Sequence, residues 1–296
     1  MRVFVTGATG FIGSEVVREL ISEGYEVLGL ARSDEAAESL AAAGATVHRG
    51  SLEDLDSLRR GAAMSDGVIH TAFMPIAAVS SNPAVACETD LRVIETLGTE
   101  LENSDRPLVI TSAIAVLKQG HIGTEENMGD STALGALRIP SEKMALSFAS
   151  RGVRTSIVRL PPSVHGDDNH GFVPTLINIA RTKGISAYIS DSSNRWSAVH
   201  RQDAARLFRL ALEKAPAGAR LHGVAEEGVL FRDIAVAIGQ RLNLPVAALS
   251  NKEASKHFSW FAPFAAIDSP ASSTLTRDLL GWRPMQPPLI QEIVGD

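Results

Sequence analysis

The sequence predicts an α/β protein with a doubly wound parallel sheet and a smaller C-terminal α/β region that interleaves with it. Three observations predict this class. A glycine-rich turn follows the first apolar run, short apolar runs then alternate with helical segments, and 296 residues are enough for a sheet domain and a smaller region. Alternating strands and helices form right-handed βαβ units whose strands pair in parallel, which is the Rossmann type of sheet.

The first thirteen residues combine a strand, a tight turn and the start of a helix. Gly7 can adopt a positive φ, Gly10 lets the backbone approach a pyrophosphate, and Gly13 allows close packing of helix and strand. The N-terminus of the helix adds free N–H groups and a partial positive charge, so a dinucleotide is expected here. The contacts expected in this turn are Gly7, Thr9, Gly10, Phe11 and Ile12.

The second strand is expected at residues 25–31, followed by Arg32 and Ser33. The end of this strand contacts the adenosine ribose: an acidic residue binds the ribose hydroxyls of NAD, whereas a cation accommodates the 2′-phosphate of NADP. Because Asp34 is placed to cap the next helix, Arg32 and Ser33 favour NADP, with NAD also possible. The alternative is that Arg32 is a solvated side chain at a strand end.

The remaining elements of the first domain follow in order. Expected are helices at 34–43, 55–61 and 83–103, and strands at 45–49, 67–73, 107–111 and 152–159. Ligands bind outside the carboxyl ends of parallel strands, so the residues that follow two of these strands should contact the cofactor. These residues are Ser51 and Leu52, where adenine would rest, and Thr71, Ala72 and Phe73.

Composition favours a small-molecule partner. A net charge of −6 and the lack of a long Lys or Arg run argue against nucleic acid and an anionic membrane. Cys87 is the only cysteine, so no intrachain disulfide is expected, and its apolar setting favours packing over nucleophilic chemistry. A cytoplasmic protein is expected, because neither a basic leader nor a run of about 18 apolar residues is present. No spacing of possible ligands suggests a metal site.

Five segments, taken in order, carry a resemblance to a known superfamily. They are residues 6–13, 109–112, 158–166, 196–203 and 280–284. Together they resemble the short-chain dehydrogenase/reductase superfamily, and the glycine pattern and the C-terminal region are similar to its extended branch, the NAD-dependent epimerases and dehydratases. The resemblance covers nearly the whole chain. It is greatest to the atypical members that keep an extended-type cofactor motif.

The resemblance implies a Tyr-x-x-x-Lys pair on the helix after the fifth strand, with an upstream serine. In that scheme the tyrosine exchanges a proton with the substrate oxygen, the lysine supports the nicotinamide ribose, and the serine polarises the carbonyl. Ser112 fits the serine position and Lys143 the lysine position, but Ile139 stands where the tyrosine should be. In the register one residue earlier, Arg138 and Glu142 occupy the two places. Neither register contains the tyrosine.

Other side chains are candidates for the missing proton donor. Tyr188 lies in an expected strand and either reaches the cleft or packs in the core. His165 takes a position where related proteins often carry tyrosine beside the nicotinamide, and His200 closes a strand. Because imidazole titrates near neutral pH, each histidine either transfers a proton or is structural. Asp90 stands where relatives often have an asparagine that anchors the active-site helix.

The domain division follows from this order. Residues 1–159 are expected to bind the cofactor and residues 160–296 mainly the substrate, with part of 200–220 packing on the first domain. The chain after residue 159 should run past the nicotinamide, its prolines restricting the backbone. This makes Pro161, Ser163 and Val164, together with Ser112, expected cofactor contacts.

Two segments of the second region have open interpretations. The polar loop at residues 166–171 either closes over the substrate as a lid or is simply exposed. The aromatic stretch at residues 256–264 either fills the core of the smaller region or forms a hydrophobic substrate pocket or a homodimer surface.

The favoured function is an NADP-dependent oxidoreductase that moves a hydride between the nicotinamide and a small carbonyl or alcohol. Ser112 would hold the substrate oxygen, Lys143 would support the ribose, and Tyr188, His165 or water would carry the proton. One alternative is an NAD-dependent nucleotide-sugar epimerase or dehydratase, which requires the tyrosine. The other is a non-catalytic NADP-binding sensor, which the missing Tyr-x-x-x-Lys pair favours.

Overall fold

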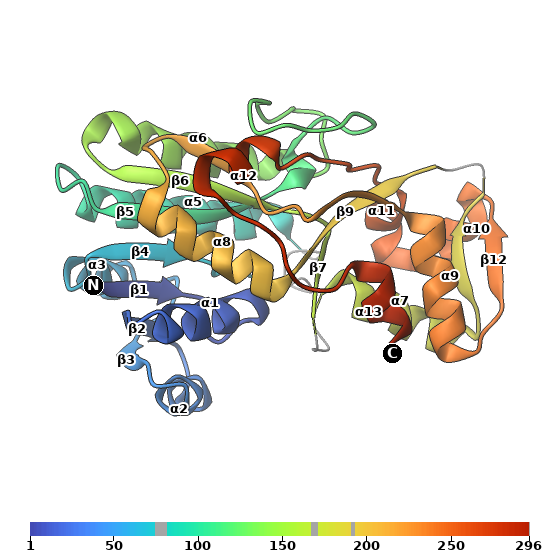
Figure 1. Ribbon diagram of the computed structural model, residues 1–296, viewed down its shortest axis with the longest axis horizontal. Helices are drawn as coiled ribbons and strands as arrows, with labels where there is room; N and C mark the ends of the chain where they lie inside the picture. The colour runs from blue at the N-terminus through green and yellow to red at the C-terminus, as the bar shows by residue number, and fades with distance from the viewer. Residues whose placement is uncertain (75–81, 167–170, 191–192, 296) are drawn as a thin grey trace.

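Seven parallel strands form the central sheet of the larger lobe, in the order β10-β6-β5-β4-β1-β2-β3 (Figure 1). The computed structural model describes residues 1–74, 82–166, 171–190 and 193–295. The strands are β1 (Arg2–Thr6), β2 (Glu26–Ala31), β3 (Thr46–Arg49), β4 (Gly67–His70), β5 (Pro107–Ala113), β6 (Arg154–Leu160) and β10 (Ala219–His222). The strand order reverses between β1 and β4, where ligands of such sheets bind. The predicted doubly wound α/β class is confirmed.

Helices cover both faces of this sheet: α1, α2 and α8 on one face, and α3, α5 and α6 on the other (Figure 1). Their bounds are α1 (Phe11–Ser22), α2 (Asp34–Ala42), α3 (Leu55–Ala63), α5 (Pro83–Glu100), α6 (Ile139–Ser147) and α8 (Arg201–Lys214). Val3, Phe4 and Val5 of β1 therefore have no exposed surface. Strands that are buried on both faces read as continuous apolar runs, which is why the sequence predicted them well.

The local chemistry of the caps sets where two of these helices begin. The side chain of Ser33 accepts a hydrogen bond from the backbone N–H of Ala36 at the start of α2. Asp54 does the same for Ser57 at the start of α3. Such caps satisfy backbone donors that the first helical turn leaves without partners, each contributing about 1 kcal/mol.

Strand β4 is shorter than the expected strand at 67–73. It ends at His70, and Thr71, Ala72 and Phe73 leave the sheet. Four short 3₁₀ helices complete the described connections: η1 (Ile114–Val116), η2 (Ala136–Arg138), η3 (Phe148–Arg151) and η4 (Ser259–Phe261). The proposed lid cannot be placed, because residues 167–170 lie outside the described residues.

The smaller lobe contains a three-stranded sheet, β11-β9-β7, and a two-stranded sheet, β12-β8. Its strands are β7 (Ser163–His165), β8 (Ser186–Ile189), β9 (Arg195–His200), β11 (Glu226–Leu230) and β12 (Val246–Leu249). Its helices are α7 (Phe172–Lys183), α9 (Phe231–Leu242), α10 (Asn251–Phe258), α11 (Ala262–Ala266) and α13 (Leu289–Val294). Trp196, Phe258 and Phe261 are buried in its core, as the core interpretation of the aromatic stretch predicts, while Trp260 is 46% exposed.

The chain crosses between the lobes more than once. After β9 it returns as α8 and β10, and β10 pairs with β6 at the edge of the large sheet. Helix α12 (Thr274–Leu280) then packs against α8 and β10 before the chain ends in α13 of the smaller lobe (Figure 1). The interleaving therefore extends beyond the expected residues 200–220.

Asp203, in the first turn of α8, attaches the segment after α12 to the larger lobe. Its carboxylate accepts hydrogen bonds from the backbone N–H groups of Met285 and Gln286, each at 2.9 Å from one carboxylate oxygen. The indole N–H of Trp282 donates to the Asp203 carbonyl oxygen at 2.9 Å. Asp203 is 2% exposed, so these bonds are made away from solvent and the crossing segment has one defined path.

Candidate cofactor and active site

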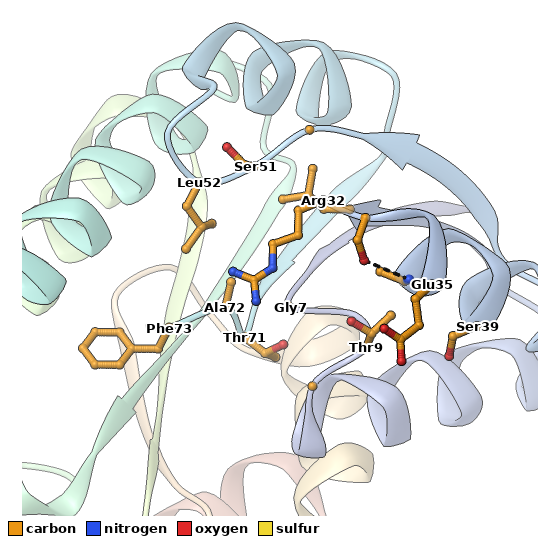
Figure 2. A pocket seen from close by; sticks show the side chains of 15 residues that line it. Gly7, Thr9, Arg32, Glu35, Ser39, Ser51, Leu52, Thr71, Ala72 and Phe73 are labelled. Carbon is orange, nitrogen blue, oxygen red and sulfur yellow. Dashed lines mark hydrogen bonds between the residues drawn. The ribbon is translucent and has the colours of Figure 1, made fainter. Parts of the chain in front are cut away.

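A cavity of about 470 Å³ lies at the carboxyl ends of the central strands, where the sheet order reverses (Figure 2). This volume is within the usual range for small-molecule sites. The sequence-predicted residues that line it are Gly7, Thr9, Gly10, Arg32, Ser33, Ser51, Leu52, Thr71, Ala72 and Phe73. Gly50, beside Ser51, lines it as well, and so do four residues that were not predicted: Leu30, Glu35, Ala36 and Ser39. Phe11 and Ile12 lie just beyond it, in the first turn of α1.

The glycine turn has the close approaches that its sequence predicts. Gly7 has a φ of +68°, and its carbonyl oxygen accepts a hydrogen bond from the N–H of Gly10 at 2.9 Å. A Cβ atom on Gly7 would lie 2.6 Å from the backbone nitrogen of Ala72, and one on Gly13 would lie 2.0 Å from the Gly7 carbonyl oxygen. Helix α1 starts after Gly10 with no acidic residue in its first turn, which leaves its N-terminus suited to a phosphate.

The end of β2 brings one cation and one carboxylate to the cavity. The guanidinium of Arg32 extends into the cavity (Figure 2) and makes no ion pair with any described residue. Arg49, in contrast, pairs with Asp34 at 2.6 Å. Ser33 accepts its bond from Ala36 at 3.2 Å and keeps a hydroxyl proton to donate. Glu35 was not predicted from the sequence. Its position in the first turn of α2, the helix that starts at the end of β2, is the signal that could have placed it at this site.

The predicted nicotinamide contacts lie at the end of β5 and after β6 and are not among the residues that line the cavity; they are Ser112, Pro161, Ser163 and Val164. Ala113 pairs with Leu160 in register, so Pro161 follows directly beside the end of β5. Ser112 and Ser163 are 2% and 1% exposed, and their hydroxyl oxygens have no hydrogen-bond partner among the described residues. Val164 is half-buried and packs against the core of the larger lobe. This end of the site therefore contains buried hydroxyl groups that no protein atom in the described part of the chain satisfies.

Helix α6 carries Lys143, which is predicted to support the nicotinamide ribose. Lys143 is exposed, whereas Ser141, Glu142 and Ala145 face the sheet. The buried register is the earlier one, with Arg138 and Glu142. Glu142 forms a bidentate pair with Arg159, with nitrogen–oxygen distances of 2.9 and 2.7 Å, and Arg159 is fully buried. The buried face of α6 thus carries a carboxylate.

Arg138 lies between the ends of β4 and β5. Its Nη2 donates to the carbonyl oxygen of Thr111 at 2.8 Å and is 3.4 Å from the Oδ2 atom of Asp90. Its guanidinium stacks over the Phe73 ring, 4.2 Å from the centroid. These contacts from three sides hold the guanidinium beside Phe73, a residue that lines the cavity.

Asp90 connects Arg138 to the glycine-rich end of β1. His70 Nε2 lies 3.2 Å from the Asp90 carboxylate, and His70 Nδ1 lies 2.6 Å from the Thr6 hydroxyl. Burial alone would raise the pKa of Asp90, but the charge of Arg138 and the hydrogen bond from His70 lower it below its usual value. Asp90 is therefore the charged counterion of Arg138, a role that an asparagine would not fill.

His165 forms the second group of titratable side chains. Its Nδ1 contacts the carboxylate of Glu292, which comes from α13, and His200 Nε2 is 3.9 Å from the same carboxylate. Burial lowers the pKa of His200. Burial would raise the pKa of Glu292, but the hydrogen bond and charge of His165 lower it. The sequence contained no local sign of Glu292, because it lies 127 residues from His165.

Tyr188 is not part of either group. It lies on β8, in the two-stranded sheet of the smaller lobe, and packs against the apolar core there. Cys87 is half-buried on α5, and burial raises the pKa of its thiol. In the parts of the chain that the structure describes, no three histidine, cysteine or acidic side chains are grouped to bind a metal. None of the described helices has both the length and the apolar character to cross a bilayer.

His222, which lies beside Arg159, gives the free energy of unfolding a measurable pH dependence. Burial, together with the positive charge of Arg159, lowers the pKa of His222 from 6.5 to about 3. Below pH 6.5 the unfolded chain binds a proton that the folded protein does not, so the free energy of unfolding falls as the pH falls toward 3. His222→Asn keeps a donor for the Ser272 carbonyl, which lies 2.8 Å from Nδ1, and removes this titration.

We expect His222 to lower the free energy of unfolding by about 2 kcal/mol between about pH 6.5 and pH 5, and the Asn variant to lack this decrease. Urea unfolding at a series of pH values measures the difference between the two proteins. Other histidines titrate equally in both, so the difference isolates His222. Parallel pH profiles for wild type and variant would contradict the expectation.

Comparison with known proteins extends these observations. A model of the NAD dependent epimerase/dehydratase family matches residues 3–222. An uncharacterized protein of Schizosaccharomyces pombe is 50% identical over 297 residues, covering 100% of this chain and 99% of the relative. A 4-hydroxy-2-methyl-3-oxo-4-farnesyl-3,4-dihydroquinoline-1-oxide ketoreductase of Stigmatella aurantiaca is 28% identical over 235 residues, covering 74% and 66%. UDP-glucose 4-epimerase of Thermotoga maritima, solved with UDP-glucose, has the same fold, with a TM-score of 0.79, 20% identity, and coverage of 99% and 96%.

Proposed function

The chain belongs to the NAD-dependent epimerase/dehydratase family, and from this membership we propose that it is an NADP-dependent oxidoreductase. It would transfer a hydride between the nicotinamide and the carbonyl carbon of a small molecule. The observation that carries the proposal is Arg32, whose guanidinium extends into the cavity beside Ser33 and pairs with no described carboxylate. A relative named as a ketoreductase supports the reaction type.

The lining of the cavity supports binding of the adenosine and pyrophosphate part of a dinucleotide. Gly7 and Gly13 leave no room for a Cβ atom, so the turn packs closely against α1 and the residues after β4, and the N-terminus of α1 would receive the pyrophosphate. Arg32 and Ser33 would hold a 2′-phosphate, and Ser51 and Leu52 would border the adenine. When bound, the nicotinamide would supply or accept the hydride.

Two residues are proposed for the chemistry at the other end. Ser112 would donate its hydroxyl proton as a hydrogen bond to the substrate oxygen, because this buried hydroxyl has no partner among the described residues. His165 would exchange the proton, with Glu292 holding its Nδ1 atom so that Nε2 is the nitrogen that reacts. Lys143 and Tyr188 are not assigned roles, since one is exposed and the other packs in the core of the smaller lobe.

Replacing Arg32 by glutamine is expected to weaken NADPH binding about 10- to 100-fold, because a charged hydrogen bond to phosphate contributes about 1.5–3 kcal/mol. NADH binding should change less than twofold. Fluorescence titration measures both affinities, and consumption of each nucleotide with a panel of ketones and aldehydes measures turnover. Arg49→Gln is the matched control, because Arg49 pairs with Asp34 and is not among the residues that line the cavity.

Preference of the wild type for NADH, or equal effects of the Arg32 and Arg49 changes, would contradict the NADP assignment. NADPH bound but never consumed would contradict the oxidoreductase. The protein would then be the second candidate, an NADP-binding sensor, which Arg138 and Glu142 at the two catalytic positions favour. An epimerase or dehydratase has less support, because the resemblance ties that chemistry to the missing tyrosine.

A further inference from the structure

At the end of β5, two buried hydrogen-bond donors have no partners among the described residues. One is the hydroxyl of Ser112, and the other is the Nε–H group of Arg138. The Nη2 atom of Arg138 donates to the carbonyl oxygen of Thr111, the residue before Ser112, so both donors belong to one small region. A buried donor without a partner is costly, so these two donors are available to a ligand that brings a hydrogen-bond acceptor.

The guanidinium is held rigidly in this region. Asp90, which is 2% exposed, lies on one side, the Thr111 carbonyl on another, and the Phe73 ring covers one face. Phe73 also lines the cofactor cavity, at its end away from Glu35 and Ser39 (Figure 2), and the stack on Phe73 places Arg138 beside that end. A donor that is already oriented loses little entropy when it binds a ligand.

We propose that Arg138 and Ser112 together bind the carbonyl oxygen of the substrate, with Arg138 replacing the tyrosine of the family's active site. This inference rests on the proposed oxidoreductase function. The ligand class is an uncharged ketone or aldehyde. Asp90 already neutralises the guanidinium, so the pair is suited to a carbonyl dipole and to the charge that develops on it rather than to a permanent carboxylate.

The replacement changes the chemistry of the step. A guanidinium does not release its proton in a protein, so Arg138 stabilises charge and is not the acid. When bound, the nicotinamide would supply the hydride that forms the new C–H bond, and the π electrons of the carbonyl would move to oxygen. Arg138 and Ser112 would hold the resulting alkoxide. A proton from water, passed through His165, would then form the O–H bond of the alcohol.

The test compares wild type, Arg138→Gln and Arg138→Lys, with Arg59→Gln as the matched control because Arg59 makes only an exposed ion pair with Asp56. Three quantities are measured: NADPH affinity, kcat/KM with the best carbonyl of the panel, and binding of isobutyramide and benzamide to the NADPH complex. An amide carbonyl accepts the same hydrogen bonds and is not reduced. The Lys variant keeps a positive charge beside Asp90, so the same three measurements can be made on it if the Gln variant does not fold.

We expect Arg138→Gln to lower kcat/KM about 100-fold or more and amide affinity at least about 10-fold, with NADPH affinity within about twofold of wild type. The Lys variant should be intermediate, and Arg59→Gln should match the wild type. Two results would overturn the proposed carbonyl-oxygen site but not the oxidoreductase proposal. One is equal amide binding by the wild type and both variants. The other is a wild type that binds NADPH but no amide. A wild type that does not bind NADPH would overturn the proposed function and this inference with it.

Discussion

Replacing Glu142 by glutamine is expected to lower the free energy of unfolding by about 3–5 kcal/mol, enough to unfold much of a marginally stable protein. The variant would leave Arg159, which has no exposed surface, without its carboxylate partner. An uncompensated buried charge is among the largest single costs in a folded protein. Glu142→Lys should be worse, because it puts a second cation beside Arg159.

Urea denaturation of wild type and Glu142→Gln measures this cost. Glu26→Gln is the matched control, because it removes the same charge from an exposed ion pair with Arg2. The Glu26 side chain is 70% exposed and the Arg2 side chain 45% exposed. Exposed pairs contribute at most about 1 kcal/mol, so the control should be close to wild type. Similar losses in the two variants would show that the Glu142 pair is not buried as described.

Replacing Gly13 by alanine is expected to abolish nucleotide binding and to destabilise the fold by about 3 kcal/mol or more. The new Cβ atom would lie 2.0 Å from the carbonyl oxygen of Gly7 and 2.8 Å from the hydroxyl of Thr71. The first contact is with backbone, which cannot move aside as a flexible side chain can. Helix α1 would be pushed away from the turn that forms the phosphate site.

NADPH titration and urea unfolding of Gly13→Ala test both parts of this expectation. Gly24→Ala is the control: Gly24 has a φ of +82°, but a Cβ atom there meets nothing within 4 Å. This variant should lower the free energy of unfolding by about 1–2 kcal/mol, because alanine must adopt the left-handed conformation there, and it should leave nucleotide binding unchanged. Nucleotide binding by Gly13→Ala at wild-type affinity would contradict the role given to this close approach.

The fold of the larger lobe could be predicted because the signals for each strand, turn and helix lie within short stretches of the sequence. Apolar runs such as 107–111 are buried on both faces, and the glycine turn carries its own geometry in Gly7 and Gly13. The family model that matches residues 3–222 confirms the resemblance drawn from short motifs. The residues that follow parallel strands could be placed in the cavity because the ends of such strands meet at one edge.

The charged partners at the active-site end were not predictable in the same way. Arg159 pairs with Glu142 across the space between β6 and α6, and Glu292 reaches His165 from the far end of the sequence. No periodicity connects positions so far apart, because their contact depends on tertiary packing. Even the choice between Lys143 and Glu142 required knowing which face of α6 meets the sheet.

Strand β10 has a consequence for how the protein is made. The glycine motif is translated before β10, and β6 has an unpaired edge until residue 222 has left the ribosome, because β10 closes that side of the sheet. An open edge of a parallel sheet invites pairing with other chains. The cofactor-binding half is therefore not a separable module: a fragment that stops at residue 159 would carry the motif but not a finished sheet, so recombination would have to transfer both halves together.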